Sequence, residues 1–185
     1  MKQWLKSFAK EYGVFILVMV LFFGFFAPLT TIGSSMNETL IDGDILMLRR
    51  TKTVERGDII QFQSDIKIDE YHLSQLNWFQ RLTVGENMNL VKRVVALPGE
   101  HVEMIQGLIF IDGNKLEETY ISHQANEIYL DFGIVPENTL FVLGDNRPVS
   151  KDSRSKDVGF VDQDSVKGRV TFRFWPLSRI GNVHS

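Results

Sequence analysis

The feature that most constrains the fold of this chain is an apolar segment near its start. Residues 12–29 are 18 consecutive residues without a charged side chain. A helix rises about 1.5 Å per residue, so a helix of this length would cross most of a hydrocarbon core about 30 Å thick. The segment therefore predicts a transmembrane helix, which we place at residues 12–30, between a short N-terminus at 1–11 and a single domain at 31–185.

The charges that flank the apolar segment predict its orientation. Lys2, Lys6 and Lys10 precede it, against one acid, Glu11. Because positively charged flanks tend to stay inside, we expect residues 1–11 to be cytoplasmic and the domain to be extracytoplasmic, at the cell membrane. The alternative is a cleaved signal peptide. Its apolar region usually extends only about 7–15 residues and ends at a small-x-small site, of which residues 31–33 are a poor version.

The composition excludes several functional classes. The chain of 185 residues has no Cys, which removes disulfides and thiolate chemistry. Its 20 Lys and Arg against 23 Asp and Glu are not the balance of a nucleic-acid-binding protein. The four histidines are scattered without the spacing of a zinc hydrolase, so we expect no metal site. They are His72, His101, His123 and His184.

Short runs rich in β-branched and aromatic residues follow the apolar segment and predict strands. They lie at residues 44–48, 58–62, 90–95, 108–111, 140–143 and 169–174. Turn residues separate them, and Asp112-Gly113 predicts a hairpin over 108–116. We therefore expect a mainly β domain. Residues 63–89 are expected to be an inserted excursion with a short helix around 72–82, and residues 117–138 a long connection or irregular strands.

One of the predicted strands carries a lysine among apolar residues. Period-two alternation places Lys92 on the same face as Leu90 and Val94. If that face is buried, loss of hydration lowers the lysine pKa from about 10.4 toward roughly 7–8, where the amine is a useful general base. The alternative is a strand lysine whose amine reaches solvent.

Two further segments carry residues that could act with such a base. Ser35 lies in a turn shortly after the apolar segment, a common place for a serine. Residues 143–154 form a polar turn, in which Asp145 and Asp152 can accept hydrogen bonds from backbone amides and Arg154 can pair with a carboxylate. Each segment alone predicts only a structural turn.

In this order the segments resemble those of the bacterial type I signal peptidases, membrane-bound Ser/Lys proteases that remove signal peptides. The resemblance covers the apolar segment and residues 34–40, 56–60, 92–100 and 144–154, and the single predicted span is similar to the Gram-positive form. It implies a serine endopeptidase that requires no metal or cofactor. It also implies two partners, the signal peptides of exported preproteins and membrane lipid.

The resemblance implies a role for each matching residue. Ser35 would be the nucleophile, Lys92 its general base, and Ser150 a hydrogen-bond partner of the lysine amine. The backbone N–H of Ser35 would stabilise the oxyanion. Its second donor stays open between Ser34, a backbone amide and water, because Gly33 stands where two-span relatives carry a hydroxyl.

The resemblance also implies which residues support the catalytic pair and which bind the substrate. Asp145, Asp152 and Arg154 would brace the site through charge-assisted hydrogen bonds. Four positions match those that line the pockets for the small residues before the cleavage site, in an Ala-x-Ala pattern. They are Thr31, Met36, Leu40 and Val91.

The chain departs from the family pattern at three positions. Glu38 replaces a proline, Ala96 a glycine and Glu100 an aspartate. The Glu38 carboxylate is predicted to keep Lys92 protonated and so to raise the working pH. A separate hypothesis is that three aromatic residues contact membrane lipid, namely Phe172, Phe174 and Trp175. The alternative is that they pack in the core.

Three other interpretations remain open at this point. The main one is a non-proteolytic relative of the family that acts as an assembly factor for surface structures. A second is a self-cleaving Ser/Lys protein of the repressor-cleavage type, which the apolar segment and the lack of a DNA-binding segment disfavour. The third is a plain membrane-tethered β domain, in which the ordered motifs would be coincidental.

Overall fold

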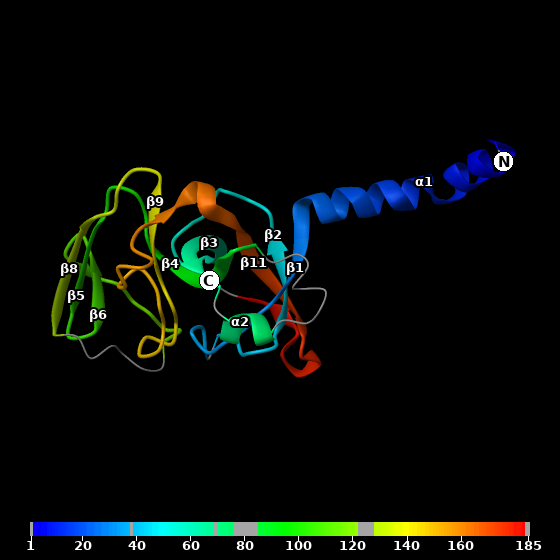
Figure 1. The fold of residues 1–185 in the computed structure, drawn as a ribbon. Coiled ribbons are helices and arrows are strands. Elements are labelled where there is room, and N and C mark those ends of the chain that lie inside the picture. The colour runs from blue at the N-terminus through cyan, green and yellow to red at the C-terminus, as the bar shows by residue number, and fades with distance from the viewer. Residues whose placement is uncertain (1, 38, 69, 76–84, 122–127, 184–185) are drawn as a thin grey trace.

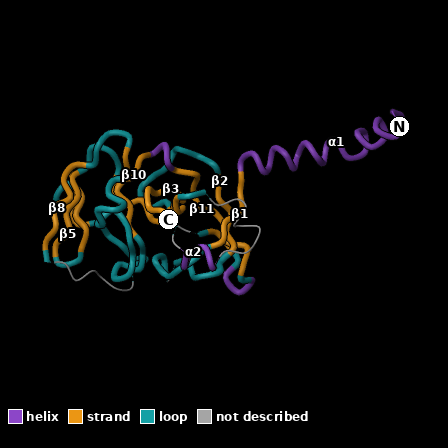
Figure 2. The backbone as a smooth tube through the Cα atoms, viewed as in Figure 1, coloured by secondary structure: helices purple, strands orange, loops and turns teal. Residues whose placement is uncertain are grey.

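The structure is a computed structural model that describes residues 2–37, 39–68, 70–75, 85–121 and 128–183. A long helix, α1 (Lys2–Phe25), leads away from a body built of strands, with the N-terminus at its far end (Figure 1). Strands account for most of the regular structure of that body (Figure 2). The expected mainly β domain is therefore confirmed.

The described strands form two antiparallel sheets. The larger sheet has the order β1-β2-β11-β3-β4-β9-β10, with β12 beside β11, and the smaller one has the order β7-β6-β5-β8. The strands of the larger sheet are β1 (Phe26–Thr30), β2 (Ile45–Arg49), β3 (Ile59–Lys67), β4 (Asn87–Ala96), β9 (Thr139–Leu143), β10 (Val161–Asp162), β11 (Val166–Trp175) and β12 (Gly181–Asn182). Those of the smaller sheet are β5 (His101–Ile105), β6 (Leu108–Ile111), β7 (Asn114–Lys115) and β8 (Tyr129–Ile134). Short helices lie between them: α2 (Glu70–Gln75), η1 (Gln163–Ser165) and η2 (Leu177–Arg179).

All six predicted strands are present, as β2, β3, β4, β6, β9 and β11, with shifted ends. The predicted hairpin is β6–β7, and its turn residues Asp112 and Gly113 have φ angles of 51° and 76°. Asp and Gly tolerate such left-handed angles, which explains why this pair marks the turn. Of the two alternatives for 117–138, a long connection or irregular strands, the second holds for Tyr129–Ile134, which forms β8 and pairs with β5 with a register shift.

The helix predicted at residues 12–30 differs at both ends. It begins at Lys2 and ends at Phe25, and the following five residues form β1, paired with β2. Pro28 explains the early end, because proline lacks the N–H that a helix interior needs and disfavours helix in the preceding residue. An edge strand tolerates it. The helices in the described part of the chain do not combine the length and hydropathy needed to cross a membrane.

The excursion predicted at 63–89 is shorter than expected. β3 continues to Lys67 and β4 begins at Asn87, so both strands extend into it. The helix predicted around 72–82 corresponds in part to α2, which begins at Glu70. Residues 76–84 lie outside the described part of the chain.

The core of the larger sheet surrounds β4. Val94 packs with Ile60 and Phe62 of β3, while Val91 packs against a second buried cluster that contains Met36 and Leu40. Each fully buried apolar side chain of this size contributes roughly 1.5–3 kcal/mol. The second cluster fixes the loop that follows β1 against β4, and so positions the candidate site.

Candidate active site

Ser35 lies in the loop between β1 and β2. The loop is closed by a turn in which the Asn37 amide donates to the Ser34 carbonyl at 3.1 Å and the Leu40 amide to the Met36 carbonyl at 2.8 Å. Met36 and Leu40 are buried, whereas Ser35 is half-buried. The apolar residues beside the nucleophile therefore anchor the turn and leave the serine hydroxyl accessible.

The amine of Lys92 lies 2.8 Å from the Ser35 hydroxyl oxygen. It also donates to the carbonyl of Val91 at 2.9 Å. Lys92 stands opposite Ile60 in the β3–β4 register, and only 2% of its surface is exposed. The prediction that this strand face is buried is confirmed, and the amine faces Ser35 at hydrogen-bonding distance.

Burial changes the protonation of this lysine. Loss of hydration lowers the pKa of Lys92 from 10.5 to about 8, although the nearby carboxylates of Asp152 and Asp145 oppose the shift. The neutral amine is therefore populated near physiological pH, which a lysine in water does not achieve. A neutral amine can accept a proton from the serine hydroxyl that it contacts.

Asp145 lies in a buried ion pair beside this dyad. Its carboxylate accepts hydrogen bonds from Arg93 at 2.9 and 2.7 Å and from the Thr39 hydroxyl at 2.5 Å. Both partners of the pair are almost fully buried. Thr39 belongs to the nucleophile loop and Arg93 follows Lys92 on β4, so Asp145 ties the two segments together.

Asp152 and Arg154 form a second pair in the polar turn. The Asp152 carboxylate accepts from the Arg154 side chain at 2.8 Å and from the Gly144 amide at 3.0 Å. Arg154 also donates to the carbonyl of Arg147 at 2.7 Å. Charge-assisted hydrogen bonds are thus present at Asp152 and Arg154 as well as at Asp145, which is paired with Arg93.

Ser150 does not form the expected hydrogen bond with the lysine amine. Its hydroxyl is buried and has no hydrogen-bond partner among the described residues. The hydroxyl instead packs against Gly144. A hydroxyl can approach the backbone this closely only where the residue lacks a Cβ, so this contact accounts for glycine at position 144.

Three of the four residues expected to line the substrate pockets lie in the loop that carries Ser35, and the fourth packs against that loop from β4. Met36 and Leu40 belong to a buried cluster, and Val91 packs against it. Thr31 is also buried, and its hydroxyl donates to the Ile41 carbonyl at 2.5 Å. The structure brings these side chains to the nucleophile loop. Glu38 lies outside the described part of the chain.

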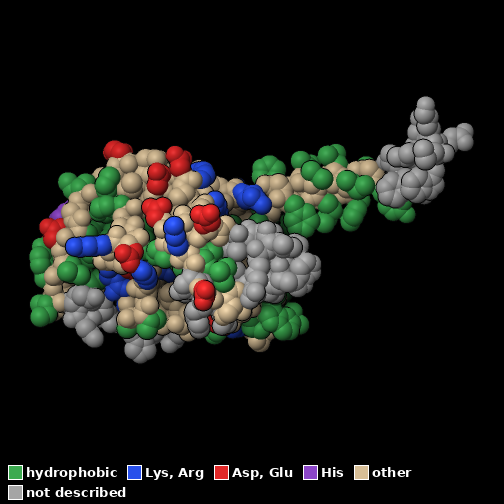
Figure 3. Space-filling model, viewed as in Figure 1, with side chains coloured by type: hydrophobic (Ala, Val, Ile, Leu, Met, Phe, Trp, Pro, Cys, Tyr) green, Lys and Arg blue, Asp and Glu red, His purple; other side chains and the backbone are tan. Residues whose placement is uncertain are grey.

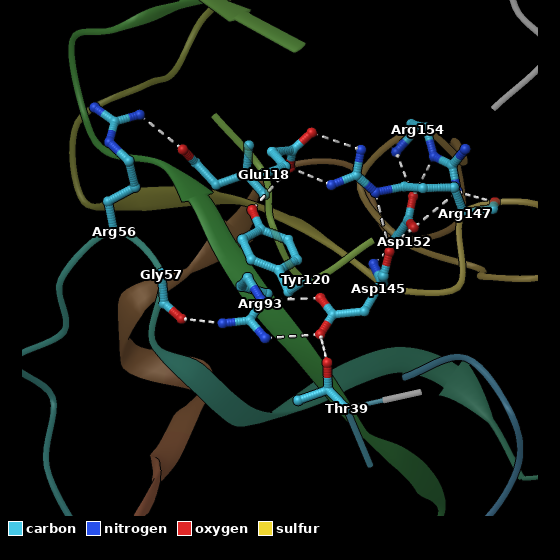
Figure 4. A network of polar contacts seen from close by, with 12 residues as sticks. Thr39, Arg56, Gly57, Arg93, Glu118, Tyr120, Asp145, Arg147, Asp152 and Arg154 are labelled. Atoms are coloured by element: carbon cyan, nitrogen blue, oxygen red, sulfur yellow. Dashed lines mark hydrogen bonds and ion pairs between the residues drawn. The ribbon is translucent and has the colours of Figure 1, made fainter. Parts of the chain in front are cut away.

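A polar network behind the site contains residues without a predicted role (Figure 4). Arg147 donates to the Gly144 carbonyl at 3.1 Å and is paired with the Glu118 carboxylate. The ring of Tyr120 lies 3.9 Å from the guanidinium of Arg93. Burial and the neighbouring Glu118 raise the pKa of Tyr120, which keeps the hydroxyl protonated to donate to Glu118.

The arrangement as a whole can support nucleophilic attack by the serine. A half-buried serine contacts an amine with a lowered pKa, and the buried Arg93–Asp145 pair joins the strand that carries the amine to the segment that contacts the serine loop. Such a pair can generate an alkoxide-like nucleophile for acyl transfer without a third catalytic group.

Comparisons with known proteins point to one family. Residues 1–175 match the family described as "Signal peptidase, peptidase S26". The chain is 30% identical to "Signal peptidase IB" of Staphylococcus aureus over 199 residues, covering 95% of this chain and 90% of that protein. It is 32% identical to "Signal peptidase I" of Bacillus licheniformis over 191 residues, covering 96% and 90%.

Among solved structures, the chain is similar to a crystal structure of a signal peptidase I from Enterococcus faecalis. The two are 33% identical, with a TM-score of 0.47, over 64% of this chain and 97% of that one. The family match and the two relatives extend over nearly the whole sequence. The chain therefore belongs to the signal peptidases of the peptidase S26 family.

Proposed function

We propose that this signal peptidase removes signal peptides from exported preproteins by attack of Ser35, with Lys92 as the general base. The observation that carries the proposal is the 2.8 Å contact between the Ser35 hydroxyl and a buried amine whose pKa is lowered to about 8. A lysine that is 2% exposed and contacts a serine has no evident structural purpose. The same contact disfavours a non-proteolytic assembly factor.

The reaction proceeds in two steps. Neutral Lys92 accepts the hydroxyl proton as the Ser35 oxygen attacks the scissile carbonyl, and then returns a proton to the leaving amine. Water, activated by the same amine, hydrolyses the acyl-enzyme. The Ser35 N–H donates to no acceptor among the described residues and is available to stabilise the oxyanion.

The substrate residues before the cleavage site would be small, in an Ala-x-Ala pattern. Val91 is half-buried and packs against the buried Met36 and Leu40, which adjoin the nucleophile, and Thr31 binds the Ile41 carbonyl in the same loop. These side chains lie close together in a packed cluster. A tightly packed apolar lining of this kind favours short side chains, because each added methylene must displace a neighbour.

The enzyme would act at the outer surface of the cell membrane, with α1 as its anchor and the N-terminus in the cytoplasm. The described part of α1 presents apolar side chains along its length (Figure 3). Ser35 follows the end of α1 by ten residues, which can extend at most about 35 Å at roughly 3.5 Å each. The nucleophile would therefore stay within reach of a signal peptide emerging from the membrane.

Lipid contact is also proposed for Phe174 and Trp175, which are exposed, with Phe172 partly covered. Trp175 stands opposite Ile45, and Ile45 opposite Thr30 at the end of β1. The exposed aromatic residues thus lie at the end of the sheet from which the Ser35 loop leaves, at the opposite end of β1 from α1. Replacement of Trp175 by Ser is expected to reduce the lipid dependence of activity, and unchanged lipid dependence would count against this contact.

A cleavage assay tests the function. Purified full-length protein in detergent is incubated with a preprotein that carries an Ala-x-Ala site, and with a matched preprotein in which the last Ala is replaced by Phe. Cleavage of the first after its last Ala, and loss of at least 100-fold with the second, is expected. Absence of cleavage across pH 7–10 would instead support the non-proteolytic alternative.

A further inference from the structure

The segment 144–146 lies directly against the backbone of the nucleophile. The side-chain amide of Asn146 donates to the Ser34 carbonyl at 3.0 Å, and its backbone amide donates to the Ser35 carbonyl at 3.1 Å. An added Cβ at Gly144 would lie 2.5 Å from the same Ser35 carbonyl. Asn146 therefore holds the carbonyls of two consecutive residues, one of which is the nucleophile.

The hydrogen bond to Ser34 has a consequence for the nucleophile. The Ser34–Ser35 peptide is trans, so the Ser34 carbonyl and the Ser35 N–H lie in one plane and point in opposite directions. A donor that fixes the direction of the carbonyl therefore also fixes the direction of the N–H. The Asn37 amide donates to the same carbonyl from within the turn, and Asn146 adds the donor from across the site.

The same geometry excludes Asn146 as a direct oxyanion donor. Its side-chain amide lies at the oxygen edge of the Ser34–Ser35 peptide, whereas an oxyanion bound by the Ser35 N–H would lie at the opposite edge. Asn146 can therefore influence the oxyanion only through the orientation of the peptide.

The residues around Asn146 make its position rigid. The preceding residue, Asp145, is fixed by Arg93 in the buried ion pair. Arg147 donates to the Gly144 carbonyl and is itself paired with Glu118. A side chain supported in this way can hold a catalytic group within the narrow tolerance that oxyanion stabilisation demands.

We propose that Asn146 is a positioning residue that aims the Ser35 N–H at the oxyanion by holding the Ser34 carbonyl. The proposal rests on the proposed role of Ser35 as the nucleophile. Its effect belongs to the transition state, because the N–H bond to the oxygen strengthens only when negative charge develops there. Substrate binding and the titration of Lys92 should both be independent of it.

The test compares Asn146→Ala and Asn146→Asp with the wild type, on an Ala-x-Ala preprotein in detergent. Both variants remove the donor to Ser34, but only the first changes the size of the side chain and only the second its charge. We expect kcat to fall about 10–100-fold in both, with KM within two-fold. The pH midpoint of activity should stay near that of the wild type for Asn146→Ala.

A peptide aldehyde that forms a tetrahedral adduct with Ser35 gives a second readout. Its inhibition constant should rise in Asn146→Ala by a factor similar to the loss of kcat/KM. Binding of the uncleaved peptide should be equal in Ser35→Ala and in Ser35→Ala/Asn146→Ala. The matched control is Asn114→Ala, which removes a side-chain amide bond to the Asp112 carbonyl in the smaller sheet and should leave kcat unchanged.

The outcomes separate this inference from the proposed function. If both Asn146 variants retain wild-type kcat while Ser35→Ala is inactive, the positioning role is wrong and the nucleophile stands. If KM rises and the aldehyde affinity does not change, Asn146 acts in substrate binding and the inference is also wrong. If Ser35→Ala retains activity, the proposed function itself fails.

Discussion

Arg93 binds both carboxylate oxygens of Asp145, at 2.9 and 2.7 Å, inside the protein. The ring of Tyr120 covers the guanidinium, and Arg93 also donates to the Gly57 carbonyl at 2.8 Å (Figure 4). The pair joins β4, which carries the base, to the loop that follows β9. Its geometry therefore connects the stability of the domain to the shape of the active site.

Replacement of Arg93 by Met should be strongly destabilising. It would leave the Asp145 carboxylate buried without its charged partner, which typically costs about 3–5 kcal/mol. The free energy of unfolding in urea measures the effect. The control is Lys151→Met, which breaks an ion pair with Asp157 between side chains that are 51% and 61% exposed. Its expected cost is below about 1 kcal/mol, and an equal cost for both variants would contradict the prediction.

Activity should rise with pH through the titration of Lys92. The amine acts as a base only when neutral, so kcat/KM is expected to increase up to a plateau with a midpoint near the lowered pKa of about 8. Asp152 raises the pKa of Lys92, so Asp152→Asn should move the midpoint to lower pH, in addition to any loss of rate. A midpoint that stays near 10 in the wild type would contradict the burial argument.

The buried lysine should also cost the protein stability. A pKa that falls from 10.5 to about 8 on folding corresponds to about 3 kcal/mol of penalty on the charged form. The penalty is complete below pH 8, where the folded protein must hold the proton, and it vanishes as pH rises toward 10.5, where the unfolded chain also loses its proton.

Lys92→Met should therefore be inactive but more stable than the wild type. The expected gain is up to about 3 kcal/mol at pH 7, shrinking between pH 8 and 10.5. Urea unfolding of both proteins at several pH values measures the difference. A variant that is less stable than the wild type at pH 7 would show that the amine is well solvated or favourably paired.

Gly144→Ala should displace the backbone of Ser35 and so misplace the nucleophile. The added Cβ would lie 2.5 Å from the Ser35 carbonyl oxygen, which is backbone and cannot move aside independently. We expect kcat to fall at least ten-fold, because a displacement of this kind misplaces the reacting atoms. Gly85→Ala is the matched control, since a Cβ there meets no atom within 4 Å. Equal activity of the two variants would argue against the close approach.

Local patterns predicted the elements whose signals lie within a few residues. The six strands and the Asp112-Gly113 hairpin follow from alternation and turn chemistry, and both are present. The burial of Lys92 followed from its apolar neighbours on β4. The end of α1 was missed although Pro28 marked it, because the uncharged run masked the strand that begins at Phe26.

Partners that are distant in sequence could not be predicted in this way. Glu118 reaches Arg147 across 29 residues and lies in a segment that carries no periodic pattern. Arg93 lies in the segment 92–100 that resembles the family. Its pairing with Asp145, however, arises because β4 and β9 are neighbours in the sheet. The role of Asn146 depends on the orientation of a single peptide plane. Such contacts arise from tertiary packing and leave no local signal.

The most direct test of the Ser/Lys dyad compares cleavage of an Ala-x-Ala preprotein by Ser35→Ala, Lys92→Ala and Ser34→Ala. The Ser35 hydroxyl contacts the Lys92 amine, so the first two variants should have no detectable activity above pH 8. Ser34→Ala should retain at least a tenth of the wild-type rate, because its hydroxyl has no assigned role. Activity that survives in Ser35→Ala, or that disappears equally in Ser34→Ala, would contradict the account.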